Sequence, residues 1–266
     1  MILLVFEGQK DEPKIMATVK TLFFHKEEQL LCSYGTDTYT LWKEVQEHIS
    51  NGFEADVFQI VKSRMHSRGD YSLDKYDTHE IEAIYLFFDY DPQNDKLGLP
   101  RINEAISSII ATFSDPMEQG QIYISYPMVE ALYCENNLPD SSFMSASATL
   151  DDCHSFKKWS KMFTMSSNRD SIQLRANKYG VVIETLTDDR ISDLKKKWIE
   201  LIRMTSAKAN YICNCVSCVP TDVSQISQSI IFQHEVSDFV SKSNCVSILS
   251  AFPLFLYEYF HGNGDF

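Results

Sequence analysis

The sequence predicts an α/β fold, with a mostly parallel sheet followed by a mainly helical C-terminal region. Up to about residue 135, short apolar runs alternate with amphipathic stretches, which is typical of βαβ units. Beyond that point the apolar spacing is helical. The composition, 44% hydrophobic and 23% charged over 266 residues, is that of a globular protein with a large core. We therefore divide the chain into an α/β domain at 1–140 and a helical domain at 141–266.

The first part begins with a strand, because Ile-Leu-Leu-Val-Phe at 2–6 is a continuous apolar run of the kind buried on both faces. A helix follows, with Asp11 as its expected N-cap and Pro13 in its first turn. The remaining expected elements are a strand at 29–34, a helix at 38–49, a strand at 56–62, a strand at 83–88, a helix at 99–113, a strand at 121–125 and a short helix at 128–134.

In the second part, the apolar spacing predicts helices at about 152–164, 190–209, 222–241 and 246–260. The last of these is dense in aromatic residues, which fits core packing and a subunit interface equally well. This helical domain would serve for docking, for oligomerisation such as a homodimer, or as a substrate channel.

The net charge of −13 is uneven, because the whole acidic excess lies within 1–140. An acidic first half argues against a domain that simply coats nucleic acid, since that requires cations. It is compatible with a carboxylate site that holds a divalent metal ion. An odd number of cysteines, no signal peptide and no long apolar run predict a soluble, cytoplasmic protein with no membrane contact.

Four acidic residues follow the expected strands of the sheet. Glu7 ends the first strand, Asp89 and Asp91 follow the strand at 83–88, and Glu130 opens the helix after the last strand. The carboxyl ends of parallel strands line one crevice, so we expect these side chains to converge. Converging carboxylates repel one another unless they are protonated or hold a cation. Ligands that supply only oxygen favour Mg²⁺ or Mn²⁺.

Three segments resemble the TOPRIM domain of topoisomerases, bacterial primases and OLD nucleases. Phe6-Glu7-Gly8-Gln9-Lys10-Asp11-Glu12 is similar to the first motif of that family, and Phe88-Asp89-Tyr90-Asp91 to the second. Tyr126-Pro127-Met128-Val129-Glu130 resembles a segment of stand-alone TOPRIM proteins of antiphage systems, such as RloB-like proteins and the PARIS effector. The resemblance covers 1–135 and implies a TOPRIM-like Rossmannoid sheet.

The resemblance also implies roles for the acidic residues. Glu7 would be a metal ligand or general base, Asp89 and Asp91 would be the metal-binding pair, and Glu130 would be an additional catalytic acid. The expected function is a Mg²⁺-dependent endonuclease acting on DNA or RNA. By resemblance it would be the toxic effector of an antiphage system controlled by a separate ATPase sensor. The alternative is a non-catalytic TOPRIM-like regulatory or binding subunit of an ATPase complex.

Basic residues near the expected site are candidates for phosphate binding. Lys10 follows Glu7 closely, and Lys62 and Arg64 end the expected strand at 56–62, on the same sheet edge as the acids. For the last two, a surface salt bridge is the alternative. A basic block at Lys157, Lys158 and Lys161 would guide nucleic acid, dock a protein partner or form a solvated helix face.

Three closely spaced cysteines, Cys213, Cys215 and Cys218, have the spacing of a zinc knuckle. The apolar residues between and around them favour the other interpretation, in which they enter the core as small hydrophobic groups.

Overall fold

A computed structural model describes residues 1–24, 29–52, 56–93, 97–135, 138–163 and 166–262. Its main sheet comprises β1 (Ile2–Phe6), β2 (Gln29–Ser33), β3 (Ala83–Asp89), β4 (Ser114–Asp115) and β5 (Gly120–Ser125), in the order β2-β1-β3-β5-β4. The pairs β2–β1, β1–β3 and β3–β5 are parallel, and the short edge strand β4 is antiparallel to β5. The mostly parallel sheet predicted from the sequence is confirmed.

Helices and a second, two-stranded sheet make up the rest of the described fold. The α-helices are α1 (Asp11–Phe23), α2 (Thr38–Ser50), α3 (Val57–Ser67), α4 (Leu99–Thr112), α5 (Leu150–Cys153), α6 (Phe156–Phe163), α7 (Ser166–Ile172), α8 (Asp188–Asn214), α9 (Gln228–His234), α10 (Ser241–Ser243) and α11 (Ala251–Gly262). Short 3₁₀ helices are η1 (Thr78–Glu80), η2 (Val129–Tyr133), η3 (Ser141–Ser145) and η4 (Val223–Ile226), and η5 (Glu235–Val240) is a π-helix. The second sheet pairs β6 (Ser147–Thr149) with β7 (Cys245–Ser247).

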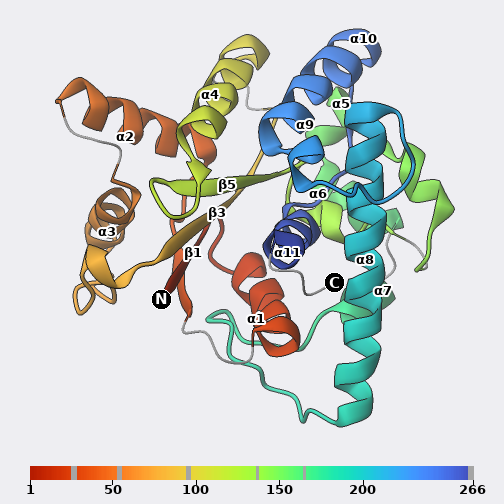
Figure 1. Cartoon of the computed structure of the whole chain (residues 1–266), viewed down its shortest axis with the longest axis horizontal. Helices are drawn as coiled ribbons and strands as arrows, with labels where there is room; N and C mark the ends of the chain where they lie inside the picture. The colour runs from red at the N-terminus through yellow and green to blue at the C-terminus, as the bar shows by residue number, and fades with distance from the viewer. Residues whose placement is uncertain (25–28, 53–55, 94–96, 136–137, 164–165, 263–266) are drawn as a thin grey trace.

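The main sheet is covered on both faces, with α2 and α4 on one side and α1 and α11 on the other (Figure 1). The helix α11 comes from the far end of the chain. Its Phe252 stacks on Phe87 of β3 at a centroid distance of 4.9 Å, and its Phe255 lies 4.9 Å from Tyr85. Residues before and after position 140 thus share one hydrophobic core. The division into domains at 1–140 and 141–266 stays a prediction.

The prediction of a strand at 56–62 is wrong, because this segment belongs to helix α3 and its N-cap. Asp56 caps the helix, and its side chain accepts a hydrogen bond from the Gln59 backbone N–H at 3.0 Å. The residues that cap helices are those with short polar side chains such as Asp. The buried Val57, Ile60 and Val61 have the three- and four-residue spacing of one helix face. Their β-branched side chains favour a strand locally, but tertiary packing overrides that preference.

The helical region differs from its prediction in detail. The stretch 152–164 is divided between α5 and α6, and 222–241 is divided between η4, α9 and the π-helix η5. The stretch 246–260 begins in strand β7, and α11 starts only at Ala251, which places Pro253 in its first turn. Asp11 is the first residue of α1 rather than its N-cap. No helix among the described residues is long and apolar enough to span a bilayer.

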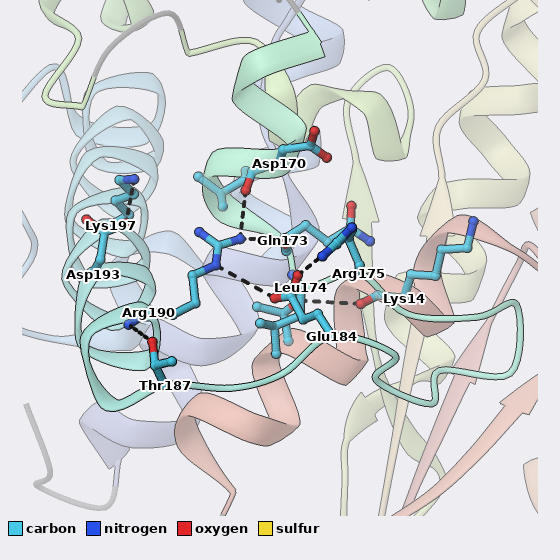
Figure 2. A network of polar contacts seen from close by, with 12 residues as sticks. Lys14, Asp170, Gln173, Leu174, Arg175, Glu184, Thr187, Arg190, Asp193 and Lys197 are labelled. Atoms are coloured by element: carbon cyan, nitrogen blue, oxygen red, sulfur yellow. Dashed lines mark hydrogen bonds and ion pairs between the residues drawn. The ribbon is translucent and has the colours of Figure 1, made fainter.

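A polar network holds the segment between α7 and α8 in place (Figure 2). Arg190 donates hydrogen bonds to the backbone oxygens of Asp170 and Gln173, at 2.8 and 3.2 Å. Glu184 lies between two guanidinium groups, with Nε of Arg175 at 3.1 Å and Nε of Arg190 at 3.7 Å. This network fixes α7, which matters below because α7 carries a cation toward the candidate site.

We expect Glu258→Ala to lower the melting temperature, because Glu258 joins α11 to the sheet. Its carboxylate accepts hydrogen bonds from the Gln121 amide at 2.6 Å and from the Tyr123 hydroxyl at 2.9 Å. An unpaired hydroxyl on the buried Tyr123 costs about 1–3 kcal/mol. Thermal unfolding measures the loss, at about 2–4 °C for each kcal/mol. Glu258→Gln keeps an acceptor oxygen and should lose less, and equal melting temperatures for wild type and Glu258→Ala would contradict the role.

Candidate acidic site at the carboxyl edge of the sheet

Glu7 is held where β1 ends, between two neighbouring elements. Phe6 pairs in register with Phe87, so the residue after β1 lies beside the end of β3. The Asp89 backbone N–H donates a hydrogen bond to Glu7 Oε2 at 3.0 Å. The Thr38 hydroxyl, in the first turn of α2, lies 3.3 Å from the same oxygen and 2.9 Å from the Asp89 carbonyl oxygen. These contacts fix the Glu7 carboxylate directly against Asp89.

Asp91 occupies an unusual backbone conformation in the turn that leaves β3. Its φ of 44° lies in the left-handed region, which few residues other than glycine adopt. The turn is fixed by a hydrogen bond from the Asp91 N–H to the Pro127 carbonyl oxygen at 3.1 Å. The Gln93 side-chain amide donates to Asp91 Oδ1 at 2.9 Å. Backbone conformations of this kind are concentrated at functional sites.

Gly8 has a steric reason to follow Glu7. Its backbone N–H donates a hydrogen bond to Glu12 Oε1 at 2.8 Å, so the Glu12 side chain folds back over position 8. A Cβ atom at position 8 would lie 2.4 Å from Glu12 Oε2, closer than atoms pack. Any side chain at position 8 would therefore displace the buried Glu12 from the site.

All four predicted acidic residues line one pocket of about 670 Å³ at the carboxyl edge of the sheet. The lining also includes three carboxylates that the sequence analysis did not select and two lysines. The acidic residues are Glu7, Asp11, Glu12, Asp37, Asp89, Asp91 and Glu130, and the lysines are Lys10 and Lys157. The convergence expected from the parallel strand ends is thus present, and the pocket is more acidic than expected.

The electrostatics of the pocket favour protonation of its inner carboxyl groups. Burial, reinforced by the neighbouring Asp91 charge, raises the pKa of Glu7 well above its usual range. Burial and the charges of Glu7 and Asp91 likewise raise the pKa of Asp89. Burial raises the pKa of Asp91 to about 6 and also raises the pKa of Glu12. A protein keeps such a cluster only if protons or a cation compensate its charge.

Two other carboxylates of the pocket, Glu130 and Asp11, are paired with cations from the helical region. Lys157 Nζ, from α6, lies 3.0 Å from Glu130 Oε1 and 3.7 Å from Asp11 Oδ2. Arg169 Nη1, from α7, lies 3.5 Å from Asp11 Oδ1. The Arg169 guanidinium also lies 4.5 Å from the centre of the Tyr133 ring. The helical region therefore forms one wall of the acidic site.

The chemistry of the inner carboxylates fits a hard divalent cation. Glu7, Asp89 and Asp91 offer oxygen donors only, the preference of Mg²⁺ and Mn²⁺, and burial leaves their charge poorly compensated. Within the part of the chain that the structure describes, no group of three or more His, Cys, Asp or Glu side chains is arranged so that it could hold a metal ion. Binding of a cation by these residues therefore requires their side chains to move closer together.

The phosphate-binding prediction for Lys62 and Arg64 depended on a strand that is a helix. On α3, Lys62 lies 3.5 Å from Asp74 and Arg64 lies 3.4 Å from Glu44. Neither residue lines the acidic pocket, because the turn of α3 carries them to other acids. Lys10 does line the pocket, at its exposed rim.

Lys157 and Lys158, two residues of the predicted basic block, lie in different surroundings. Lys157 is drawn into the acidic site, whereas Lys158 is exposed and does not line the pocket. The side chain of Lys161 lies outside the described residues. Sequence spacing placed these lysines on one helix face and gave no sign that Lys157 contacts Glu130.

The closely spaced cysteines divide into two environments. Cys213 is buried near the end of α8, in keeping with the core interpretation. Cys215 and Cys218 are exposed, so that interpretation is wrong for them. Cys215 has a φ of 58° and forms the left-handed C-cap of α8. Zinc binding by these cysteines stays an open prediction.

Sequence reasoning missed several residues of the pocket for identifiable reasons. Glu12 lies within the predicted first motif, and its four-residue distance from Gly8 is a signal that could have been used. Asp37 is the N-cap of α2, and its side chain accepts a hydrogen bond from the Thr40 N–H, which assigns it a local structural role. Lys157 carries no signal, because its contact depends on how α6 packs.

No protein-family model, no curated protein and no solved structure matches this chain.

Proposed function

We propose that this protein is a metal-dependent phosphodiesterase that cleaves nucleic acid. The observation that carries the proposal is the convergence of Glu7, Asp89 and Asp91 at the carboxyl edge of a parallel sheet, in a pocket open to solvent. The raised pKa values of these carboxyl groups indicate that their negative charges lack a compensating cation within the protein. The TOPRIM-like order of the motifs adds the expectation of phosphodiester chemistry.

The chain's own residues would divide the work. A bound Mg²⁺ or Mn²⁺ would supply Lewis acidity and lower the pKa of water, as phosphodiester hydrolysis requires. Glu7, Asp89 and Asp91 would hold that ion. The Asp89 N–H and the Thr38 hydroxyl orient the Glu7 carboxylate, so Glu7 stays directed toward the other acids. Burial raises the pKa of Glu7, which makes its carboxylate a stronger base once it is ionised and so suits general-base catalysis.

The biological setting that we propose is antiphage defence, with a separate ATPase sensor that controls the nuclease. The support is the resemblance of Tyr126–Glu130 and the two acidic motifs to stand-alone TOPRIM effectors. The helical wall around the pocket offers a surface through which a partner could act on the site, because α6 and α7 contact the acids directly.

A non-catalytic regulatory or binding subunit of an ATPase complex is the second candidate. The observation that favours it is the arrangement of the acids, since no tight metal-holding group occurs among the described residues. In that case the pocket would hold protons in place of a cation, and the raised pKa values would be its resting state.

The test is to incubate the purified chain with labelled single- and double-stranded DNA and RNA in Mn²⁺, Mg²⁺ and EDTA. We expect cleavage with either metal ion and none in EDTA. Cleavage in EDTA would contradict a metal-dependent mechanism. Absence of both cleavage and Mn²⁺ binding, alone and with a co-expressed ATPase partner, would favour the binding subunit.

A further inference from the structure

The cations on the helical wall are arranged unequally around the acids. The Glu130 side chain is only 3% exposed, and the described cation nearest to it, Lys157, has a side chain that is 59% exposed. Lys157 thus reaches into the pocket from solvent on a long flexible stem. Asp11, by contrast, has two other cations within 4.0 Å, Arg169 and Lys14, besides Lys157.

We propose that Lys157 is a mobile counter-ion of this site. While no divalent cation is bound, Lys157 neutralises Glu130. Once a divalent cation is bound, Lys157 leaves Glu130 and contacts a phosphate of the substrate. The inference rests on the proposed function for its substrate, a nucleic-acid backbone. It assigns to Lys157 the phosphate-binding role that the sequence had given to Lys62 and Arg64.

Charge compensation is the first reason for such an exchange. A nearly buried carboxylate without a cation is strongly disfavoured, so Glu130 needs Lys157 while no metal ion is nearby. The charge of Glu130 acts on Asp89 and Asp91, so a divalent cation held by those residues also compensates Glu130. Lys157 is then free to leave without stranding a buried charge.

The fate of Asp11 is the second reason. When Lys157 moves, Asp11 keeps Arg169 at 3.5 Å and Lys14 at 4.0 Å. Arg169 is itself positioned over the Tyr133 ring and by α7, which the Arg190 network fixes (Figure 2). The helical wall therefore carries one movable cation, Lys157, and one fixed cation, Arg169.

The third reason is reach. Lys157 lines the pocket together with Glu7 and Asp89, whereas Lys62 and Arg64 are paired with acids elsewhere. A primary ammonium on a flexible stem suits a cation that changes partners, because its three donors are not fixed in one plane.

The experiment compares Lys157→Gln with Lys158→Gln, which removes the same charge from the adjacent exposed position. Mn²⁺ binding is measured by electron paramagnetic resonance on the metal-free protein. We expect Lys157→Gln to bind Mn²⁺ roughly three- to tenfold more tightly, because a competing charge is gone. Lys158→Gln should bind Mn²⁺ as the wild type does.

The second measurement is binding of a labelled oligonucleotide in Ca²⁺ over a series of salt concentrations. Lys157→Gln should weaken binding and flatten the slope of log K against log salt by about 0.7–0.9, the value of one phosphate contact. Lys157→Arg should restore the slope. Lys157→Gln should lower the melting temperature of the metal-free protein, because Glu130 loses its cation. A wild-type circular dichroism spectrum at the assay temperature therefore serves as the evidence that the variants are folded.

Three outcomes would overturn the proposal. Unchanged Mn²⁺ affinity in Lys157→Gln would show that Lys157 does not compete with the metal ion. Weaker Mn²⁺ binding would show that Lys157 merely holds Glu130 in place as a ligand. An unchanged salt slope would show that it contacts no phosphate. If the expected shifts occur but the wild type cleaves no nucleic acid, the proposed function fails and the counter-ion role of Lys157 stands.

Discussion

Asp89→Asn is expected to abolish nucleic-acid cleavage while raising the melting temperature of the metal-free protein. Asn keeps the size of the side chain and removes a charge from the most crowded part of the acidic pocket. The activity loss should be at least about a thousandfold, as for removal of a central catalytic group. The gain in stability follows because burial and then the charges of Glu7 and Asp91 disfavour an ionised Asp89, and Asn carries no charge. Initial cleavage rates in Mn²⁺ and thermal unfolding in EDTA measure the two effects.

A matched control for this variant is Glu118→Gln, which removes one negative charge from an exposed position outside the pocket. It should leave both cleavage and melting temperature unchanged. If Asp89→Asn cleaves at the wild-type rate, Asp89 takes no part in the mechanism. If the variant is inactive and also melts at a lower temperature, loss of structure explains the inactivity and Glu7→Gln becomes the decisive variant.

The metal-free protein is expected to be more stable at pH 5 than at pH 8, and Mn²⁺ is expected to reduce this difference. Burial and like charges raise the folded-state pKa values of Glu7, Asp89 and Asp91 above those of the unfolded chain. The folded protein therefore binds more protons between about pH 4 and the raised values, so its stability falls as pH rises through that window. For Asp91 the window ends near its folded pKa of about 6.

The size of this effect is measurable by thermal unfolding. Each unit of raised pKa removes about 1.4 kcal/mol by the top of its window, and each kcal/mol is worth about 2–4 °C. We expect the melting temperature in EDTA to fall by at least about 5 °C between pH 5 and pH 8. Mn²⁺ should raise the melting temperature more at pH 8, where fewer protons compete for the carboxylates.

The double variant Glu7→Gln with Asp89→Asn separates the pocket from the rest of the protein. It should lose the share of the pH dependence that the pocket contributes and most of the Mn²⁺ effect. A remaining share should come from Glu135 and Glu235, whose pKa values burial also raises. An equal pH dependence in the wild type and the double variant would show that the pocket carboxylates are already ionised at pH 5. That result would contradict the raised pKa values and with them the need for a compensating cation.

The sheet and the convergence of the acids could be predicted from the sequence because both depend on local patterns. The buried apolar run at 83–88 identifies β3 directly, and parallel strand ends lie at one edge of a sheet. The error at α3 has the same local origin, since Val57, Ile60 and Val61 favour a strand by their side chains alone. The N-cap at Asp56 was the signal for a helix.

The helical wall of the site could not be predicted from local patterns. Lys157 contacts Glu130 and Asp11, both of which lie far from it in the sequence. These contacts form because α6 packs against η2. Lys62 and Arg64 were expected at the sheet edge because their segment was predicted to be a strand, and helix α3 pairs them with Asp74 and Glu44. Tertiary packing selected a cation from the other half of the chain.

The packing of α11 on the sheet also determines when the protein can fold during synthesis. The aromatic side chains of Phe6, Tyr85 and Phe87 are covered by Phe252 and Phe255 of α11. During synthesis, α11 leaves the ribosome long after the strands do. Until then the aromatic face of the sheet is exposed, and the nascent chain is a substrate for chaperones and proteases. A chain that ended before Ala251 would keep this aromatic face exposed, and we expect it to aggregate instead of forming the acidic pocket.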